Sequence, residues 1–149
     1  MFAKLLVIAC GLIGACRADD ALVIRDAWTR ASPPGVDTAA VYLVAENSRD
    51  RNAVIVSVGT PRATMAHLHE VRKIGDRRGM RPVHHLTVPA GGQAVLASGA
   101  HHIMLKGLAR PLVQGETFAL TLRLEDGSRA QAQVRVGAID ALAAPRGNH

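Results

Sequence analysis

Cysteine is scarce in this chain of 149 residues, and both of its cysteines, Cys10 and Cys16, lie near the N-terminus. Cys10 sits inside a short apolar run, and Cys16 follows that run directly. A domain built from the rest of the chain therefore has no internal disulfide. It also lacks the thiolate that a blue-copper electron-transfer site or a cysteine nucleophile requires.

Aromatic residues make up only 3% of the chain, which is too few for a platform that stacks nucleic-acid bases. We therefore expect no nucleic-acid partner. The formal net charge of +6 points to weakly acidic partners at most. The sequence shows neither a nucleophile motif nor a paired-carboxylate site, so we expect a protein that is not an enzyme.

Long hydrophobic runs are also missing, apart from one between Leu5 and Ala15. At about eleven residues this run is too short to span a bilayer as a helix, but it fits the core of a signal peptide. We therefore predict a signal peptide over residues 1–18. Two cleavage positions stay open. One lies before Asp19, and the other lies before Cys16, because residues 13–16 resemble a bacterial lipobox whose cysteine carries a lipid anchor.

The remaining sequence is rich in short strand patterns. Residues 118–124 and 130–136 alternate apolar and polar side chains, and Asp126-Gly127 between them is typical of a hairpin turn. Such strands, separated by glycine and proline, predict an all-β sandwich that forms a single domain over residues 19–137. We expect residues 138–149 to be a flexible C-terminal tail.

Histidine and methionine gather between residues 65 and 104. The residues concerned are Met65, His67, His69, Met80, His84, His85, His101, His102 and Met104. Imidazole nitrogen and thioether sulfur are the uncharged ligands that soft Cu(I) accepts, whereas zinc usually recruits cysteine or a carboxylate as well. This composition therefore favours a cuprous site.

Strand geometry suggests how four of these residues could meet. His102 and Met104 are two residues apart, so a strand would place both side chains on one face. If residues 75–79 form the turn of a hairpin, His69 and Met80 come roughly opposite each other. His67 would share the face of His69 and is a candidate auxiliary ligand.

The spacing of the four residues, H-x10-M-x21-H-x-M, resembles the metal motif of periplasmic copper chaperones of the PCu(A)C type. The resemblance extends from about Leu22 to Val136. It includes five further segments: Asp26-Ala27-Trp28-Thr29-Arg30, Leu68-His69-Glu70, Gly79-Met80-Arg81-Pro82-Val83, Val88-Pro89-Ala90-Gly91-Gly92 and His102-Ile103-Met104-Leu105-Lys106-Gly107-Leu108.

This resemblance implies a cupredoxin-like β-sandwich in the periplasm that binds Cu(I) through His69, Met80, His102 and Met104. It implies delivery of copper to the binuclear copper centre of cytochrome c oxidase, with subunit II as the acceptor, or to other periplasmic copper proteins. The chain departs from some relatives at Glu70, where they have methionine. Its tail offers only His149 in place of a His- and Met-rich extension for Cu(II).

Two alternatives remain open at the level of sequence. A β-sandwich lipoprotein that binds no metal, acting as an adhesion or assembly module, would share the strand pattern. A basic cluster around the expected hairpin is either a solvated loop or a surface that steers the chain toward an acidic acceptor. The cluster consists of Arg72, Lys73, Arg77, Arg78 and Arg81.

Overall fold

Alternating apolar and polar side chains build the strands of this protein, whose computed structural model describes residues 22–146. These residues form ten strands and no helix. The strands are β1 (Leu22–Arg30), β2 (Thr38–Asn47), β3 (Ala53–Gly59), β4 (Ala63–Ile74), β5 (Arg77–Pro82), β6 (Leu86–Val88), β7 (Gln93–Leu96), β8 (His101–Leu108), β9 (Thr117–Leu124) and β10 (Arg129–Gly137). The predicted all-β class is confirmed.

The hairpin of β9 and β10 shows how sequence dictates the core. Phe118, Leu120, Leu122 and Leu124 are all buried, while the residues between them are exposed or half-buried. Gly127 has a positive φ of 85° in the connecting turn, a conformation that glycine adopts without steric cost. The hairpin predicted here from period-two patterning is therefore confirmed.

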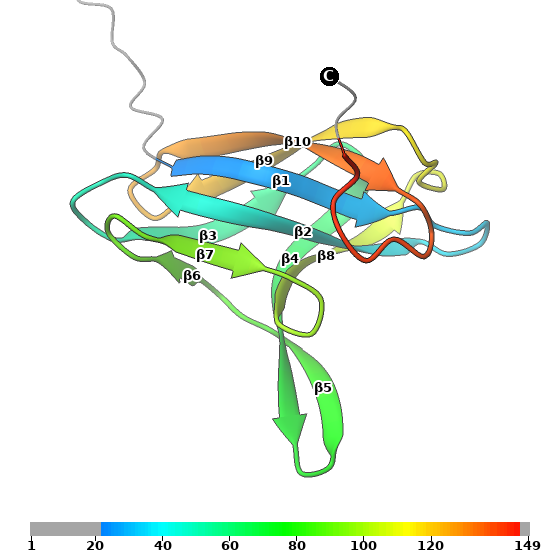
Figure 1. Cartoon of the computed structure of the whole chain (residues 1–149), viewed down its shortest axis with the longest axis horizontal. Helices are drawn as coiled ribbons and strands as arrows, with labels where there is room; N and C mark the ends of the chain where they lie inside the picture. The colour runs from blue at the N-terminus through cyan, green and yellow to red at the C-terminus, as the bar shows by residue number, and fades with distance from the viewer. Residues whose placement is uncertain (1–21, 147–149) are drawn as a thin grey trace, which may run out of the picture.

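All ten strands belong to one hydrogen-bonded sheet, which curls around the core (Figure 1). The strand order is β5-β4-β8-β2-β1-β10-β9-β3-β6, with β7 also paired to β2. Every pair is antiparallel except β1 with β10. The curl brings β3 back beside β4, so the apolar faces of the sheet close over a single hydrophobic cluster.

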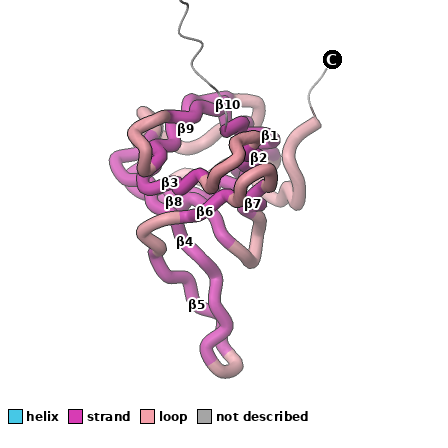
Figure 2. The backbone as a smooth tube through the Cα atoms, turned by 90° about the vertical axis from the view of Figure 1, so that its left-hand side faces the viewer, coloured by secondary structure: helices cyan, strands magenta, loops and turns pink. Residues whose placement is uncertain are grey.

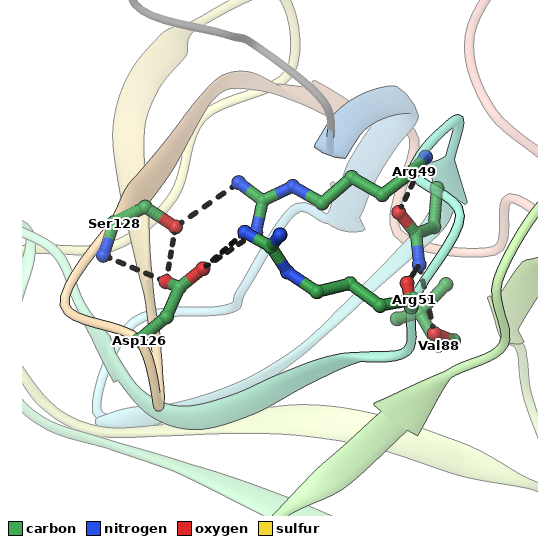
Figure 3. A network of polar contacts seen from close by, with 6 residues as sticks. Arg49, Arg51, Val88, Asp126 and Ser128 are labelled. Atoms are coloured by element: carbon green, nitrogen blue, oxygen red, sulfur yellow. Dashed lines mark hydrogen bonds and ion pairs between the residues drawn. The ribbon is translucent and has the colours of Figure 1, made fainter.

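A polar network fixes the loops at one end of the sheet (Figure 3). Asn47 is almost completely buried, and its side-chain amide donates to the carbonyl of Val88 at 3.1 Å. Arg49 donates to Asp126 at 2.6 Å. Hydrogen bonds from Ser128 are the main reason that the pKa of Asp126 falls to about 2. These bonds tie the loop after β2 to the β9–β10 turn.

The chain after β10 returns toward β1. Arg30 donates from Nε to the carbonyl oxygen of Ala141 at 2.7 Å, and its guanidinium lies 5.9 Å from the ring centre of Trp28. The expected signal peptide, with Cys10 and Cys16, lies outside the described residues. Within residues 22–146, no helix has the length and apolar character needed to cross a membrane.

One hairpin departs from the body of the molecule. The distal half of β4 and the whole of β5 project as a finger in both views (Figures 1 and 2). β5 is an edge strand that pairs only with β4, and a two-residue turn at Gly75-Asp76 joins the two. The predicted metal ligands lie on this hairpin and on β8.

Candidate metal centre

The pairing of β4 with β8 places two histidines directly opposite each other. His69 on β4 is the register partner of His102 on β8. In the same ladder Met104 is the partner of His67. Residues two apart on a strand share a face, and directly paired residues share it across strands. His69, His102 and Met104 therefore lie on one face of the sheet, with His67 beside them.

Met80 reaches the same face from β5. Its register partner on β4 is Val71, and the partner of His69 is Pro82. Met80 is thus displaced by two residues from the position opposite His69 that the sequence predicted. The turn occupies only Gly75-Asp76, whereas the prediction placed it over residues 75–79. Since a shift of two residues preserves the face, Met80 stays on the side of His69.

The two imidazoles lie close together and each has an unused nitrogen. Their ring centres are 5.6 Å apart in an edge-on arrangement, and His102 is only 3% exposed. His69 Nδ1 and His102 Nε2 are buried without a hydrogen-bond partner; in residues 22–146 the other such side-chain atom is Arg62 Nε. Unpartnered buried nitrogens are rare in folded proteins, and an ion is one of the recognised explanations.

A backbone contact orients the second imidazole. His102 hydrogen-bonds to the backbone of Ala100, and this bond raises its pKa, so the ring donates to the carbonyl oxygen. Since Nε2 is unpartnered, the donating atom is Nδ1. The lone pair on Nε2 is thereby left free on the face shared with His69. Such a hydrogen bond to the far nitrogen is typical of histidines that bind metals.

The methionines supply donor atoms that are needed in addition to the two imidazoles. Among the described residues, no group of three or more histidine, cysteine, aspartate or glutamate side chains is arranged to hold a metal ion. A site on this face therefore needs thioether sulfur in addition to the two imidazoles. Met80 is 63% exposed and Met104 is half-buried, so Met80 does not serve as core filler. Two imidazoles and two thioethers form an uncharged donor set that fits Cu(I).

Comparison with known proteins identifies the family. A family model described as "Putative lipoprotein LpqE-like" matches residues 22–136. The chain belongs to this LpqE-like family. A putative lipoprotein of Leifsonia xyli subsp. xyli is 33% identical over 118 residues, which cover 78% of this chain and 70% of that protein.

Solved structures confirm that this LpqE-like chain has the fold of PCuAC domains. The Cu(I) form of DR1885 from Deinococcus radiodurans is 34% identical, with a TM-score of 0.61 over 78% of this chain and 76% of that one. The apo form of DR1885 is 30% identical, with a TM-score of 0.63 over 93% of each chain. The apo PmoF2 PCuAC domain is 22% identical and has a TM-score of 0.69, over 83% of this chain and 95% of that one, which supports the fold.

Burial favours the uncharged form of both histidines of this LpqE-like site. Desolvation lowers the pKa of His69, and the nearby His102, His67 and Lys106 lower it further. Desolvation is also the main reason that the pKa of His102 is lowered, although the bond to Ala100 opposes it. A metal ion binds only the neutral imidazole, so the lowered pKa values favour the form that can bind.

An ion-pair cluster lies on the opposite face of the same three strands. Glu70 accepts a hydrogen bond from Arg81 at 2.6 Å and pairs with Arg72 at 2.7 Å, while His101 Nε2 lies 3.7 Å away. The Arg81 bond is the main cause of the lowered pKa of Glu70. Glu70, Arg81 and His101 each adjoin in sequence one of His69, Met80 and His102. The cluster therefore ties together the strands that carry three of the four predicted ligands.

Sequence reasoning identified Glu70 only as a departure from some relatives. The alternation of side chains between the two faces of a strand could have revealed its role. Glu70 is one residue from His69 and must therefore face the other side of the strand. The structure also places His84 and His85 in the connection between β5 and β6, rather than within one strand. His67 is exposed beside Met104, and Met65 is 49% exposed two residues before it.

We expect the free energy of unfolding of the metal-free chain to fall as the pH drops below about 6.5. Below this pH an unfolded chain protonates His69 and His102 at their ordinary pKa, whereas the folded chain holds both pKa values lower. Protons therefore stabilise the unfolded state. Urea denaturation at a series of pH values measures the slope, and a His69→Gln/His102→Gln variant should flatten it. A slope that is the same in this variant and the wild type would contradict the assignment.

Replacing Glu70 by Gln should loosen the β4–β5 hairpin, because the carboxylate that binds Arg81 and Arg72 loses its charge. Amide hydrogen exchange should accelerate over residues 70–82 and stay unchanged in β9 and β10. Glu46→Gln is a matched control, since Glu46 pairs with Arg25 at 2.6 Å between β1 and β2. Equal protection of the hairpin in the Glu70 variant and the control would show that the cluster does not hold it.

Proposed function

We propose that this protein is a Cu(I)-binding chaperone rather than an enzyme, with His69, Met80, His102 and Met104 as its ligands. One observation carries the proposal. Two facing imidazoles have buried, unpartnered nitrogens, and two methionines lie on the same face. Two similar structures that contain copper, the Cu(I) form of DR1885 and the copper-bound PCuAC domain of PmoF2, support it.

The donor set suits a carrier that gives its metal away. None of the four ligands carries a charge, so bound Cu(I) keeps its positive charge and gains no thiolate bond. A thiolate-containing acceptor forms stronger bonds to this soft ion and can displace the ligands one at a time. Met80, which is largely exposed on a projecting hairpin, is the ligand that an acceptor can reach first. The exchange moves a cuprous ion without changing its oxidation state.

The acceptor that fits this surface has an acidic face. Residues 70–81 carry five lysines and arginines against two carboxylates, and this hairpin supplies half of the chain's net charge of +6. Lys73, Arg77 and Arg78 are exposed on it. We infer that this charge steers the chain toward a copper acceptor such as cytochrome c oxidase subunit II or another periplasmic copper protein.

The proposed location is the periplasmic side of a membrane, with attachment through lipidated Cys16. Its support is the lipobox-like sequence Ile13-Gly14-Ala15-Cys16 together with the family description and the relative from Leifsonia xyli, both of which name putative lipoproteins. Attachment at this point would leave a few residues between the lipid and β1. The domain could then reach acceptors that are themselves bound to the membrane.

Replacing Met80 and Met104 together by leucine should abolish tight Cu(I) binding while preserving the fold, because leucine keeps the volume and apolarity of methionine. The measurement is an anaerobic Cu(I) titration against a competing chelator, with urea denaturation as the check on folding. Met65→Leu is the control, since Met65 is exposed on β4 but is not a proposed ligand. Unchanged affinity in the double variant would refute the ligand set. If the wild type binds no stoichiometric Cu(I), the alternative hypothesis, an adhesion or assembly module that binds no metal, is the better interpretation.

Reversing charge on the hairpin should slow copper transfer. An Arg77→Glu/Arg78→Glu variant is expected to deliver Cu(I) to the soluble copper domain of a cytochrome c oxidase subunit II about tenfold more slowly at low salt. The difference should vanish as salt screens the charges. Arg123→Glu/Arg129→Glu is the control, because these exposed arginines are register partners on β9 and β10 and carry the same charge change. Equal slowing in both variants would contradict steering by the hairpin.

A Cys16→Ala variant should be recovered in the soluble extracytoplasmic fraction, because it has no thiol to accept a lipid. The wild type should remain in the membrane fraction, where mass spectrometry of its first residue would identify the modification. A Cys10→Ala variant serves as the control, since Cys10 lies within the expected signal peptide. Membrane recovery of the Cys16 variant would remove the anchoring proposal.

A further inference from the structure

His67 and His84 occupy matching positions on neighbouring chain segments. β5 ends at Pro82, which pairs with His69, but the antiparallel contact goes one residue further. Val83 donates its backbone N–H to the carbonyl oxygen of Leu68 at 2.9 Å. The next residue on each segment is His67 on β4 and His84 after β5. Directly opposed residues in such a ladder have Cβ atoms about 5 Å apart.

Both imidazoles lie on the exposed side of these segments. Leu68 is buried, and Val83 packs against the hydrophobic core, so these two side chains face inward. His67 follows the alternation of β4 and therefore faces outward, and His84, in the bend after β5, is exposed as well. Both residues also line one open cavity of about 240 Å³ beside β3. Their placement thus rests on the register, the alternation and the shared cavity.

Neither imidazole is engaged elsewhere. In the described part of the chain, no side-chain hydrogen bond or ion pair joins the imidazole of His67 or His84 to another residue. Zinc or copper binds imidazole nitrogen at about 2.0–2.1 Å, so two rings on opposed positions can hold one ion between them. The cavity lining contains no methionine, cysteine or carboxylate, and its other residues are apolar apart from Ser57.

We propose that His67 and His84 form a second metal site, selective for a divalent ion, with Cu(II) bound most tightly. The cavity that both imidazoles line contains no thioether, and imidazole nitrogen suits the borderline divalent ions, among which copper forms the strongest complexes. Water completes the coordination on the exposed side. The site is separate from the His69 and His102 pair, although His67 also neighbours Met104 across the β4–β8 ladder. It does not depend on the proposed chaperone function.

The test uses the full chain after one equivalent of Ag(I), a redox-inert ion with the soft character of Cu(I), has been added to occupy the methionine-containing site. Cu(II) is then titrated and followed by electron paramagnetic resonance. One further equivalent should bind, with nitrogen couplings from two imidazoles. His67→Gln and His84→Gln should each weaken it by about tenfold or more. His85→Gln is the matched control, because His85 is adjacent to His84 but not placed opposite His67, and it should leave binding unchanged.

Three outcomes would overturn the proposal: no second equivalent, an equivalent that survives both substitutions, or an equivalent that needs His67 but not His84. The last would assign His67 to the first site. The Met80→Leu/Met104→Leu variant separates this test from the proposed function. It should lose Ag(I) binding and keep a Cu(II) signal that disappears when His67→Gln or His84→Gln is added, so either site can fail without the other.

Discussion

The pairing of β4 with β8 is the constraint on which the candidate site depends. It sets His69 opposite His102 and leaves a buried nitrogen on each ring with no protein partner. Because side chains alternate across a strand, a slip of one residue would send one imidazole into the hydrophobic core. Leu68 and Ile103 are buried and paired in the same ladder, so the apolar core enforces the register that the histidines need.

The two faces of β4, β5 and β8 have different roles: one carries the proposed ligands, and the other carries the ion pairs that join the strands. The face that carries His69 and His102 holds the proposed uncharged ligands, and desolvation lowers the pKa of both imidazoles there. On the opposite face, Glu70 forms ion pairs with Arg81 of β5 and Arg72 of β4 and so links the two strands. A charged anchor is tolerated there because arginine satisfies the carboxylate oxygens. The same carboxylate placed among the ligands would instead favour a harder, divalent ion.

Because the hairpin projects from the body of the molecule, the site is accessible to another protein but poorly shielded from solvent. β5 has one strand partner, and Met80 near its middle is mostly exposed to solvent. An exposed thioether is open to oxidation, but an acceptor can also approach it without opening the core. Under the proposed function, the basic residues along the hairpin would favour the approach of acidic acceptors. This arrangement suits transfer of an ion better than its storage.

The sequence by itself determined the all-β class, the β9–β10 hairpin and the resemblance to PCu(A)C chaperones. Period-two patterning and ligand spacing are local properties. The alternation from Phe118 to Leu124, for example, identifies the buried face of β9 without information from any other strand. Only the tertiary structure decided that His69 meets His102, that Met80 lies two residues from its expected position, and that His84 comes beside His67. Those placements depend on strand order and on a two-residue turn at Gly75-Asp76. Pairing between strands distant in sequence is set by the energy of packing the whole core, which no short stretch of residues encodes.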